Sequence, residues 1–400
     1  MDLDGKLSQG VPIGNDISFL LAEVVLAQVD RAMGSAATRS FRWFDDYEFG
    51  VDTEDQAAAM LKRLNRQLAK FKLRLNPRKT VIKKLPLPAQ DEWQDTLRQA
   101  GAARFASARE MVKYFDLAFR LREQFPDAPV LTYAMGMLFK LMCPATDVAR
   151  VAQSCITQTL LCEPGAAQKA FALLIFWRLN GLTLDLPLIT NTISQVIIRH
   201  EACGFSSDVA WALAFCLDQR IVLNGRAGRI LSVFDDDCTA LQALHMDCIG
   251  LLPKGFHKKH ISKVLKNADL DREHWLLAYE SVRQGFLGVC RRIVQRNPFF
   301  NALLARDVTF YRTALPPYAT VIHVGGAPEW VVRQWLGLAT GVEPSEKVRG
   351  EPKVLGFIRE DVARLSPQPT SVDDLTAQLI GILAPQADVG EEEQMDVYPA

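Results

Sequence analysis

Apolar residues recur at helical spacing in two segments near the start of the chain. In residues 11–31, most apolar positions are separated by three or four residues: Ile17, Leu20, Leu21, Val24, Val25 and Val29. The second segment is residues 54–70, where Leu61, Leu64, Leu68 and Phe71 lie on one face of the helical projection. Both patterns are typical of amphipathic helices.

Extended segments are predicted between and after these helices. In residues 41–51, apolar and polar residues alternate on both sides of Asp45 and Asp46, as they do on the two strands of a β-hairpin around its turn. The segment FKLRL (71–75) alternates as a strand, NPRKT (76–80) interrupts it, and VIKKLPL (81–87) is expected to be extended until the prolines end it. The pattern therefore predicts a mixture of helix and strand for residues 1–100.

From about residue 101 the chain changes to helix after helix, with Gly or Pro about every 18 to 22 residues. Pairs of helices at a period near 40 are typical of a HEAT-like solenoid. We therefore predict a mainly α protein with an α+β segment at residues 1–100, an all-α HEAT-like domain at 101–385 and a disordered acidic tail at 386–400. A chain of 400 residues is long enough for two domains.

The composition indicates an ordinary globular protein. Apolar residues make up 49% of the chain, charged residues 23%, and the formal net charge is zero, so the total charge favours neither nucleic acid nor membrane. The eight cysteines form no C-x-x-C pair and lie in apolar surroundings, which is typical of buried reduced thiols. The sequence shows no signal peptide and no stretch of roughly 18 apolar residues. We expect a cytoplasmic protein with no membrane partner.

The adjacent aspartates Asp45 and Asp46 are the first candidates for chemistry. A tight turn allows neighbouring side chains to face one side, whereas a straight strand sends them to opposite faces. Two carboxylates held together repel unless one is protonated or a cation is bound. Hard cations such as Mg²⁺ prefer these oxygen ligands. The alternative is a solvated turn, because Asp is a common turn residue.

Two flanking segments carry further candidates. Upstream, GVPIGNDIS (10–18) combines Gly10, Pro12 and Gly14 with Ser18 at a loop-to-helix junction, where backbone can approach a ligand closely. An ordinary helix start is the alternative. Downstream, LNPRKT (75–80) places Lys79 where an ammonium group can protonate or stabilise a leaving pyrophosphate. A solvated surface lysine is the alternative there.

A basic strip is predicted on the second helix. Residues 61–84 contain ten Lys or Arg and no acidic residue. Four of these cations lie largely away from the leucine face: Lys62, Arg63, Arg66 and Lys70. Such a strip attracts a phosphate backbone by counterion release, and a solvated helix face is the alternative.

In this order and spacing, the three segments resemble the palm of reverse transcriptases. GVPIGNDIS is similar to the family's glycine–proline–glycine–serine motif, and LNPRKT to its leucine–asparagine–lysine–threonine element. RWFDDY (42–47) is similar to its aromatic-x-Asp-Asp box, with Trp43 where the family usually has tyrosine. The resemblance covers residues 3–85. With the helical region that follows, it is strongest to the bacterial abortive-infection and defence-associated reverse transcriptases, which join a polymerase module to a HEAT-like domain.

The resemblance implies an RNA-directed or untemplated DNA polymerase of bacterial phage defence that uses two-metal nucleotidyl transfer. Asp45 and Asp46 would bind catalytic Mg²⁺ or Mn²⁺, and Lys79 would be the general acid. Nucleotide or template would be positioned by Gly10, Pro12, Gly14, Ser18, Trp43 and Phe44. The implied partners are nucleic acid, deoxynucleoside triphosphates and further copies of the chain in a homo-oligomer.

The chain departs from the family in one respect. The family has a further aspartate on an earlier palm strand and a fingers subdomain, but Asp2 and Asp4 lie too close to the glycine–proline motif to fill that role. Either the sequence is an N-terminally incomplete fragment or its palm is degenerate. The competing hypothesis is a non-catalytic helical scaffold whose palm remnant binds nucleic acid or a partner subunit.

Two other clusters are given structural interpretations. Phe234, Asp235, Asp236 and Asp237 repeat the earlier box, but the helical pattern TALQALHM follows them, so we expect helix capping. His257 and His260 have the spacing of a shared metal site. Because no third ligand lies nearby, a basic helix start is the favoured interpretation.

Overall fold

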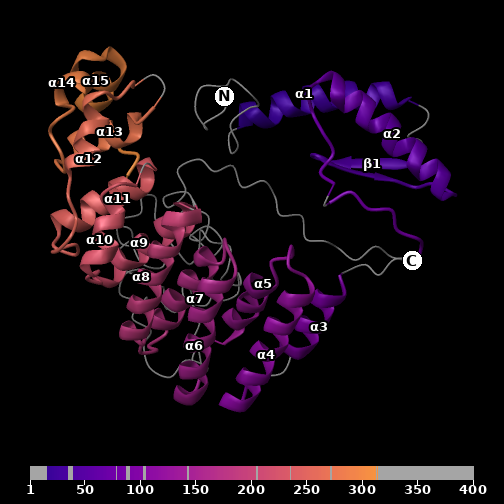
Figure 1. Ribbon diagram of the computed structural model, residues 1–400, viewed down its shortest axis with the longest axis horizontal. Helices are drawn as coiled ribbons and strands as arrows, with labels where there is room; N and C mark the ends of the chain where they lie inside the picture. The colour runs from indigo at the N-terminus through magenta and orange to yellow at the C-terminus, as the bar shows by residue number, and fades with distance from the viewer. Residues whose placement is uncertain are drawn as a thin grey trace, which may run out of the picture. The chain divides into compact units, whose positions relative to one another are not determined.

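The computed structural model describes most of the first 313 residues, in these ranges: 16–34, 39–77, 79–86, 91–101, 105–141, 144–203, 206–234, 236–270, 273–311 and 313. Within them it contains fifteen α-helices and one two-stranded antiparallel sheet, so the protein is mainly helical, as predicted (Figure 1). No helix in the described ranges combines the length and apolar character needed to cross a membrane. The chain divides into two compact units between residues 89 and 90.

Several predictions fall outside the described residues. They concern Gly10, Pro12, Gly14, Cys143, Asp235, residues 314–385 of the predicted helical domain and the acidic tail at 386–400. Ser18, Trp43, Phe44, Lys79 and the aspartate pair all lie within the described ranges.

The first unit consists of two helices and a hairpin: α1 (Asp16–Met33), β1 (Ser40–Trp43), β2 (Asp46–Phe49) and α2 (Glu54–Lys70). Its small core is formed by Leu26, Val29, Met33, Leu64 and Leu68, with Tyr47, Phe49, Met60 and Leu75 packed against it. The helix after the glycine loop, the hairpin and the segment that begins at Leu75 therefore share one core. α2 has the predicted bounds, and its N-cap Thr53 accepts a hydrogen bond from the Gln56 amide at 3.2 Å.

The prediction of a strand at residues 71–75 is wrong. Lys72 has a positive φ of 60°, and its amide donates to the Ala69 carbonyl at 3.1 Å. The Leu73 amide donates to the Leu68 carbonyl at 3.0 Å, so these residues close the C-terminus of α2 in a Schellman motif. An alternating pattern becomes a strand only beside a partner strand, and in the described part of the chain β1 and β2 pair with each other alone.

The second unit contains a three-residue 3₁₀ helix, Leu138–Lys140, and thirteen α-helices within the described residues. These are α3 (Glu92–Gly101), α4 (Ala108–Gln124), α5 (Val130–Met137), α6 (Thr146–Cys162), α7 (Ala167–Leu179), α8 (Leu186–Cys203), α9 (Ser206–Gln219), α10 (Gly225–Leu231), α11 (Asp237–Cys248), α12 (Lys259–Lys266), α13 (Trp275–Arg283), α14 (Arg291–Arg296) and α15 (Pro298–Ala305).

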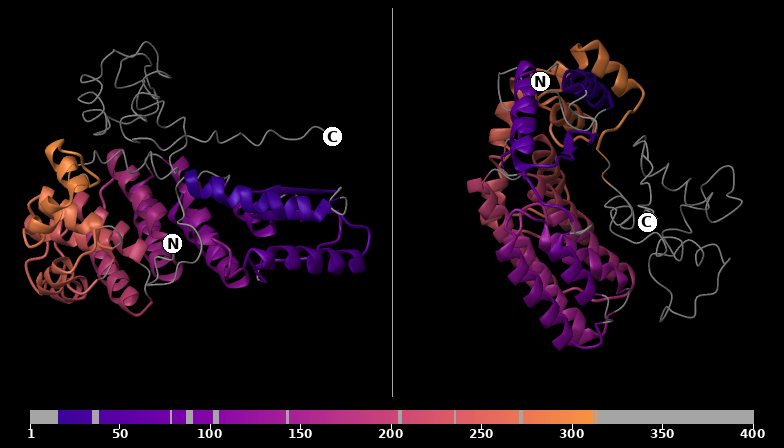
Figure 2. Two further views of the ribbon diagram at one scale, coloured as in Figure 1. Left: turned by 90° about the horizontal axis from the view of Figure 1, so that it is seen from above. Right: turned by 90° about the vertical axis from the view of Figure 1, so that its right-hand side faces the viewer.

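Most of these helices form two alternating series. In one series α4 packs on α6, α6 on α8, and α8 on α10; in the other, contacts run from α3 through α5, α7, α9 and α11 to α13. Figure 1 shows these helices side by side, and Figure 2 shows the stack from two further directions. Helices of the first series begin at residues 108, 146, 186 and 225, which are 38, 40 and 39 residues apart. This spacing agrees with the predicted period near 40.

Buried polar side chains connect successive helices of the stack. The Glu163 carboxylate, which follows α6, accepts from the amides of Leu131 (2.9 Å) and Thr132 (2.8 Å) in the first turn of α5. The Trp177 indole on α7 donates to the Leu141 carbonyl at 2.7 Å. These bonds satisfy backbone groups that packing hides from water, and they set the register of each helix on the one before it.

The stability of the second unit is expected to fall as the pH drops, through His245 on α11. This side chain is 8% exposed, and its Nδ1 lies 2.9 Å from the Tyr311 hydroxyl oxygen. Burial, and then the charge of Arg220, lower the pKa of His245 from its ordinary value of 6.5. The unfolded chain therefore takes up a proton first as the pH falls through about 6.5, and the free energy of unfolding decreases below that pH.

Urea unfolding at about pH 7.5 and about pH 5.5 measures this difference. In the variant His245→Gln, the difference in free energy of unfolding between the two pH values should be smaller. The variant His257→Gln, which changes an exposed ring, should keep it. An undiminished pH dependence in His245→Gln would show that another group is responsible.

Candidate active site

The two aspartates lie at the tip of the hairpin, but only one of them is a turn residue. In the antiparallel register, Ser40 lies opposite Phe49 and Trp43 opposite Asp46. The turn therefore consists of Phe44 and Asp45, and Asp46 begins β2, which shifts the predicted two-aspartate turn by one residue. Phe44 has a positive φ of 51°, as the first residue of a type II′ hairpin turn does. This conformation is rare for an aromatic residue and indicates a turn held by its surroundings.

Both carboxylates are available for a ligand. Asp45 and Asp46 are exposed, and neither forms an ion pair with another described residue. They are hard oxygen donors without a counterion, so they fit as two of the ligands of a Mg²⁺ ion. Among the described residues, no group of three or more His, Cys, Asp or Glu side chains is placed to hold a metal.

Arg42 on β1 ties the hairpin to α1 and to its own turn. Its guanidinium Nη2 lies 2.6 Å from Glu23 Oε1 and 2.9 Å from Asp30 Oδ2, both on α1. Its Nη1 donates to the Phe44 carbonyl at 2.7 Å, which supports the turn in its unusual conformation. Tyr47, opposite Arg42 in the register, donates its hydroxyl to Asp30 Oδ1 at 2.9 Å.

Arg42 forms its ion pairs with Glu23 and Asp30 and not with the aspartates of the hairpin tip. The hydrogen bond from Arg42 lowers the pKa of Glu23, and the hydrogen bonds to Glu23 and Asp30 raise the pKa of Arg42. Burial, followed by the bond to Asp30, raises the pKa of Tyr47. The charge of Arg42 is thus engaged by α1 and does not neutralise the negative charge at the hairpin tip.

Sequence reasoning missed Arg42 and its two acidic partners. A signal was present, because Glu23 and Asp30 are seven positions apart and so lie on one face of a helix two turns apart. Arg42, a partly buried arginine directly before the aspartate box, is the matching cation.

The turn contacts the start of α1 through aromatic rings. The centroid of the Phe44 ring lies 6.0 Å from that of Phe19 and 5.6 Å from that of Trp43. The three side chains are 57%, 53% and 66% exposed, respectively. Exposed rings of this kind can stack on nucleic-acid bases. Ser18, the residue before Phe19, is only 7% exposed.

The structure shows no contact between Lys79 and the aspartates. Lys79 is exposed, and its amide donates to the Asn76 carbonyl at 3.1 Å in a short turn. Thr80 binds the same carbonyl through its hydroxyl at 2.8 Å. Leu75 anchors this segment to the core of the first unit. No hydrogen bond or ion pair within the described residues joins the Lys79 side chain to Asp45 or Asp46.

The predicted basic strip on α2 is exposed along its length: Lys62, Arg63, Arg66 and Lys70. Arg63 donates to the Ala32 carbonyl near the C-terminus of α1 at 3.3 Å, and Lys70 to Gln67 Oε1 at 2.6 Å. The acceptor in each of these two bonds is uncharged, so neither bond neutralises the positive charge of the strip.

Replacing Arg42 with methionine is expected to loosen the hairpin from α1. Methionine keeps much of the aliphatic part of the Arg42 side chain but removes the bonds to Glu23, Asp30 and the Phe44 carbonyl. Because the freed carboxylates are partly exposed and rehydrate, the cost should be about 1–2 kcal/mol. Hydrogen exchange of residues 40–49 measures the loosening and should be faster in the variant.

The matched control for this variant is Arg39→Met. The side chains of Arg39 and Asp52 form an ion pair and are 70% and 71% exposed, respectively. Loss of this exposed pair should leave hydrogen exchange in the hairpin unchanged. Equal acceleration by both variants would show that Arg42 has no special role in holding the turn.

The acidic and histidine clusters near α11 have structural roles. Asp236 is the N-cap of α11 and accepts from the Thr239 amide at 2.8 Å, which confirms the capping prediction at this residue. Asp237 Oδ1 lies 2.6 Å from His274 Nδ1, and Asp235 lies outside the described residues. The His257 amide donates to Ser232 Oγ at 2.8 Å, just before α12 begins.

The prediction that the cysteines are buried is wrong for three of them. Cys162, Cys238 and Cys248 are exposed, whereas Cys155, Cys216 and Cys290 are buried. The exposed thiols lie at the ends of α6 and α11, where an apolar sequence neighbourhood no longer means packing against another helix.

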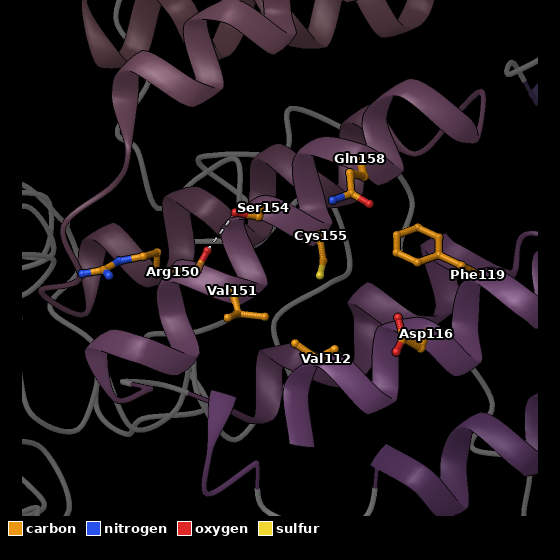
Figure 3. Close-up of a pocket in the computed structure, with 8 residues that line it drawn as sticks. All are labelled: Val112, Asp116, Phe119, Arg150, Val151, Ser154, Cys155 and Gln158. Atoms are coloured by element: carbon orange, nitrogen blue, oxygen red, sulfur yellow. Dashed lines mark hydrogen bonds between the residues drawn. The ribbon is translucent and has the colours of Figure 1, made fainter. Parts of the chain in front are cut away.

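A pocket of about 380 Å³ lies between α4 and α6 in the second unit (Figure 3). Burial raises the pKa of the Cys155 thiol in its wall to about 11, so the thiol is protonated at neutral pH. The Ser154 hydroxyl donates to the Arg150 carbonyl at 3.2 Å and is engaged within its own helix. The lining therefore provides no activated nucleophile, and the hairpin tip is the stronger candidate site.

The chemistry of the hairpin tip is inferred from its own side chains. Protein-family models, curated proteins and solved structures were each compared with the chain, and none of these comparisons finds a match.

Proposed function

We propose that the first unit carries a nucleotidyl-transfer site of the reverse-transcriptase type, and that the protein makes DNA, RNA-directed or untemplated, in bacterial phage defence. One observation carries the proposal: Asp45 and Asp46 are exposed at the tip of a hairpin whose turn is held by Arg42. Two neighbouring exposed carboxylates that no described residue neutralises suit a site for hard divalent cations.

Each group of side chains has a role in this proposal. Asp45 and Asp46 would hold Mg²⁺ or Mn²⁺, which, when bound, supplies stabilisation of phosphoryl charge. The exposed rings of Phe19, Trp43 and Phe44 would stack on bases, and the α2 strip would hold the phosphate backbone. Lys79 is proposed as the general acid and would have to approach the tip when substrate binds.

The second unit is proposed to be a HEAT-like array. Its two alternating helix series at a spacing near 40 residues support this assignment. Such an array offers extended surfaces, and we propose that it also mediates self-assembly into a homo-oligomer.

Removal of divalent metal is expected to stop nucleotide incorporation. The purified chain is supplied with labelled deoxynucleoside triphosphates and Mg²⁺, with and without an RNA template and an oligonucleotide primer. Products should form, cease when EDTA is added, and return on addition of excess Mg²⁺ or Mn²⁺. A folded protein that gives no product under any of these conditions overturns the proposal.

A second candidate function is a non-catalytic scaffold that binds nucleic acid. The exposed cations of α2 and the three exposed rings at the hairpin favour it, because both bind nucleic acid without a metal. Oligonucleotide binding that persists in EDTA, together with absent incorporation in Mg²⁺, would select the scaffold over the enzyme.

A further inference from the structure

A second basic surface lies in the other unit of the protein. It consists of six exposed cations on α10, on the loop after α11 and on α12, which we name the α10–α12 basic surface: Arg226, Arg229, Lys254, Lys259, Lys263 and Lys266. Residues 249–267 contain five lysines and two histidines but no acidic residue, and residues 224–234 contain no acidic residue either.

Backbone contact joins α10 to the loop that carries Lys254. A Cβ atom on Gly228 would lie 2.6 Å from the Lys254 carbonyl oxygen and 3.0 Å from the Phe256 amide nitrogen, so only glycine permits this approach. The position of a Cβ on Gly225 lies 3.6 Å from Lys254 Cβ and 3.8 Å from Arg229 Nη1. The backbone that carries Lys254 therefore lies beside α10, which carries Arg226 and Arg229.

Hydrogen bonds fix the loop in this position. The buried Ser232 hydroxyl donates to the Gly228 carbonyl at 2.8 Å and accepts from the His257 amide at 2.8 Å. The exposed cations of α10 and of this loop are consequently carried by backbone that the fold holds together, and a bound polyanion would contact both.

α12 presents its lysines opposite a buried face. Ile261 and Leu265 are 1% and 0% exposed in the core, whereas Lys259 and Lys263 are one helical turn apart and exposed. The rise between these two lysines is about 6 Å. Because the apolar side of α12 is already buried, the helix has no apolar face to insert into a lipid surface.

Within the described residues, none of the six cations has an ion-pair partner. Neighbouring cations do have partners: Lys258 lies 2.8 Å from Asp247, and Arg283 lies 2.9 Å from Asp307. Charges spread over α10, the loop and α12 suit a polymer with repeating negative charges better than one compact anion.

We propose that the α10–α12 basic surface binds the phosphate backbone of nucleic acid, independently of base sequence. The contacts are charges without the paired donors and acceptors that read base edges, so they position a strand and do not select it. This inference goes beyond the proposed chemistry of the hairpin and does not require the aspartate pair to be catalytic.

Charge reversal on α12 is expected to weaken binding strongly. The full chain carrying Lys259→Glu, Lys263→Glu and Lys266→Glu is titrated, in EDTA, against fluorescein-labelled single- and double-stranded oligonucleotides of mixed sequence. Its affinity should fall at least about 10-fold. From three lost phosphate contacts, the slope of log K against log salt should become shallower by about 2 for single strands and about 2.7 for duplex. EDTA keeps the readout independent of metal at the hairpin.

Two matched variants make this result interpretable. The triple variant Arg109→Glu, Lys113→Glu and Arg120→Glu changes three exposed cations on α4, with the same change in net charge, and should bind nearly as the parent does. The double variant Lys62→Glu and Arg66→Glu changes the basic strip on α2 in the first unit. Its affinity shows how much of the binding depends on that strip and how much on the α10–α12 basic surface.

The inference is overturned by any of three outcomes in variants whose thermal unfolding is unchanged. In the first outcome, the α4 variant loses as much affinity as the α12 variant. In the second, the α12 variant binds oligonucleotides as the parent does. In the third outcome, charge reversal on α12 abolishes only binding to vesicles of 7:3 phosphatidylcholine and phosphatidylserine, which would assign the surface to anionic lipid.

Discussion

Replacing Asp45 with asparagine is expected to reduce metal-dependent nucleotide incorporation at least about 100-fold. The substitution keeps the size of the side chain but removes one of the two charges offered to the cation. Metal ions contribute several kcal/mol to the stabilisation of phosphoryl charge, and about 2.7 kcal/mol corresponds to this factor. Asp46→Asn should have a comparable effect, because both carboxylates are exposed and neither is paired with another described residue.

Incorporation rates and Mn²⁺ binding, measured by titration, should fall together in these variants. Asp55→Asn is the matched control, since Asp55 is an exposed acid in the first turn of α2 and lies outside the hairpin. Thermal unfolding should be unchanged in all three, because the hairpin-tip carboxylates form no bond that stabilises the fold. Wild-type rates in Asp45→Asn would remove the aspartate pair from the mechanism.

Replacing Trp177 with alanine is expected to destabilise the second unit by about 3–5 kcal/mol. The side chain is 0% exposed near the C-terminal end of α7, and its indole donates to the Leu141 carbonyl at 2.7 Å. Truncation leaves a large cavity and also an unsatisfied carbonyl in a region that excludes water. Because a typical domain is stable by only 5–15 kcal/mol, this loss is a large fraction of the whole.

Urea unfolding followed by circular dichroism measures this loss. Trp177→Phe fills most of the space and removes only the indole donor, so its cost should be smaller, about 1–3 kcal/mol. Trp43→Ala is the surface control, because Trp43 is 66% exposed and should contribute little to stability. A cost for Trp177→Ala no larger than that for Trp43→Ala would contradict the packing described for α7.

The helices were the most predictable part of this protein. α2 has the predicted bounds of 54–70, and the described residues after about 101 form helix after helix, as predicted. Helix hydrogen bonds and caps lie within a few residues of each other, as the Thr53 cap of α2 shows. Strands were less predictable: the hairpin formed because its partner strand is two residues away, while residues 71–75 have an alternating pattern but no partner.

The apolar pattern of α1 illustrates a second limit. Val29 is 0% exposed, as its helical spacing suggests, but Ile17, Leu20 and Val24 are 70%, 65% and 54% exposed. Periodicity indicates that a helix has an apolar side, whereas the position of the neighbouring element decides which part of that side is covered.

By itself, the sequence determined the helical character of the chain, the hairpin around the aspartates and the basic strip of α2, because local hydrogen bonding and side-chain spacing specify these features. Only the tertiary structure decided that Arg42 holds the turn against α1, and that α10 packs against the loop at 254–256, which precedes α12. These features join residues 12 to about 30 positions apart in the chain. Coulomb and hydrogen-bond energies depend on distance in space, which the fold sets and which no short sequence pattern records.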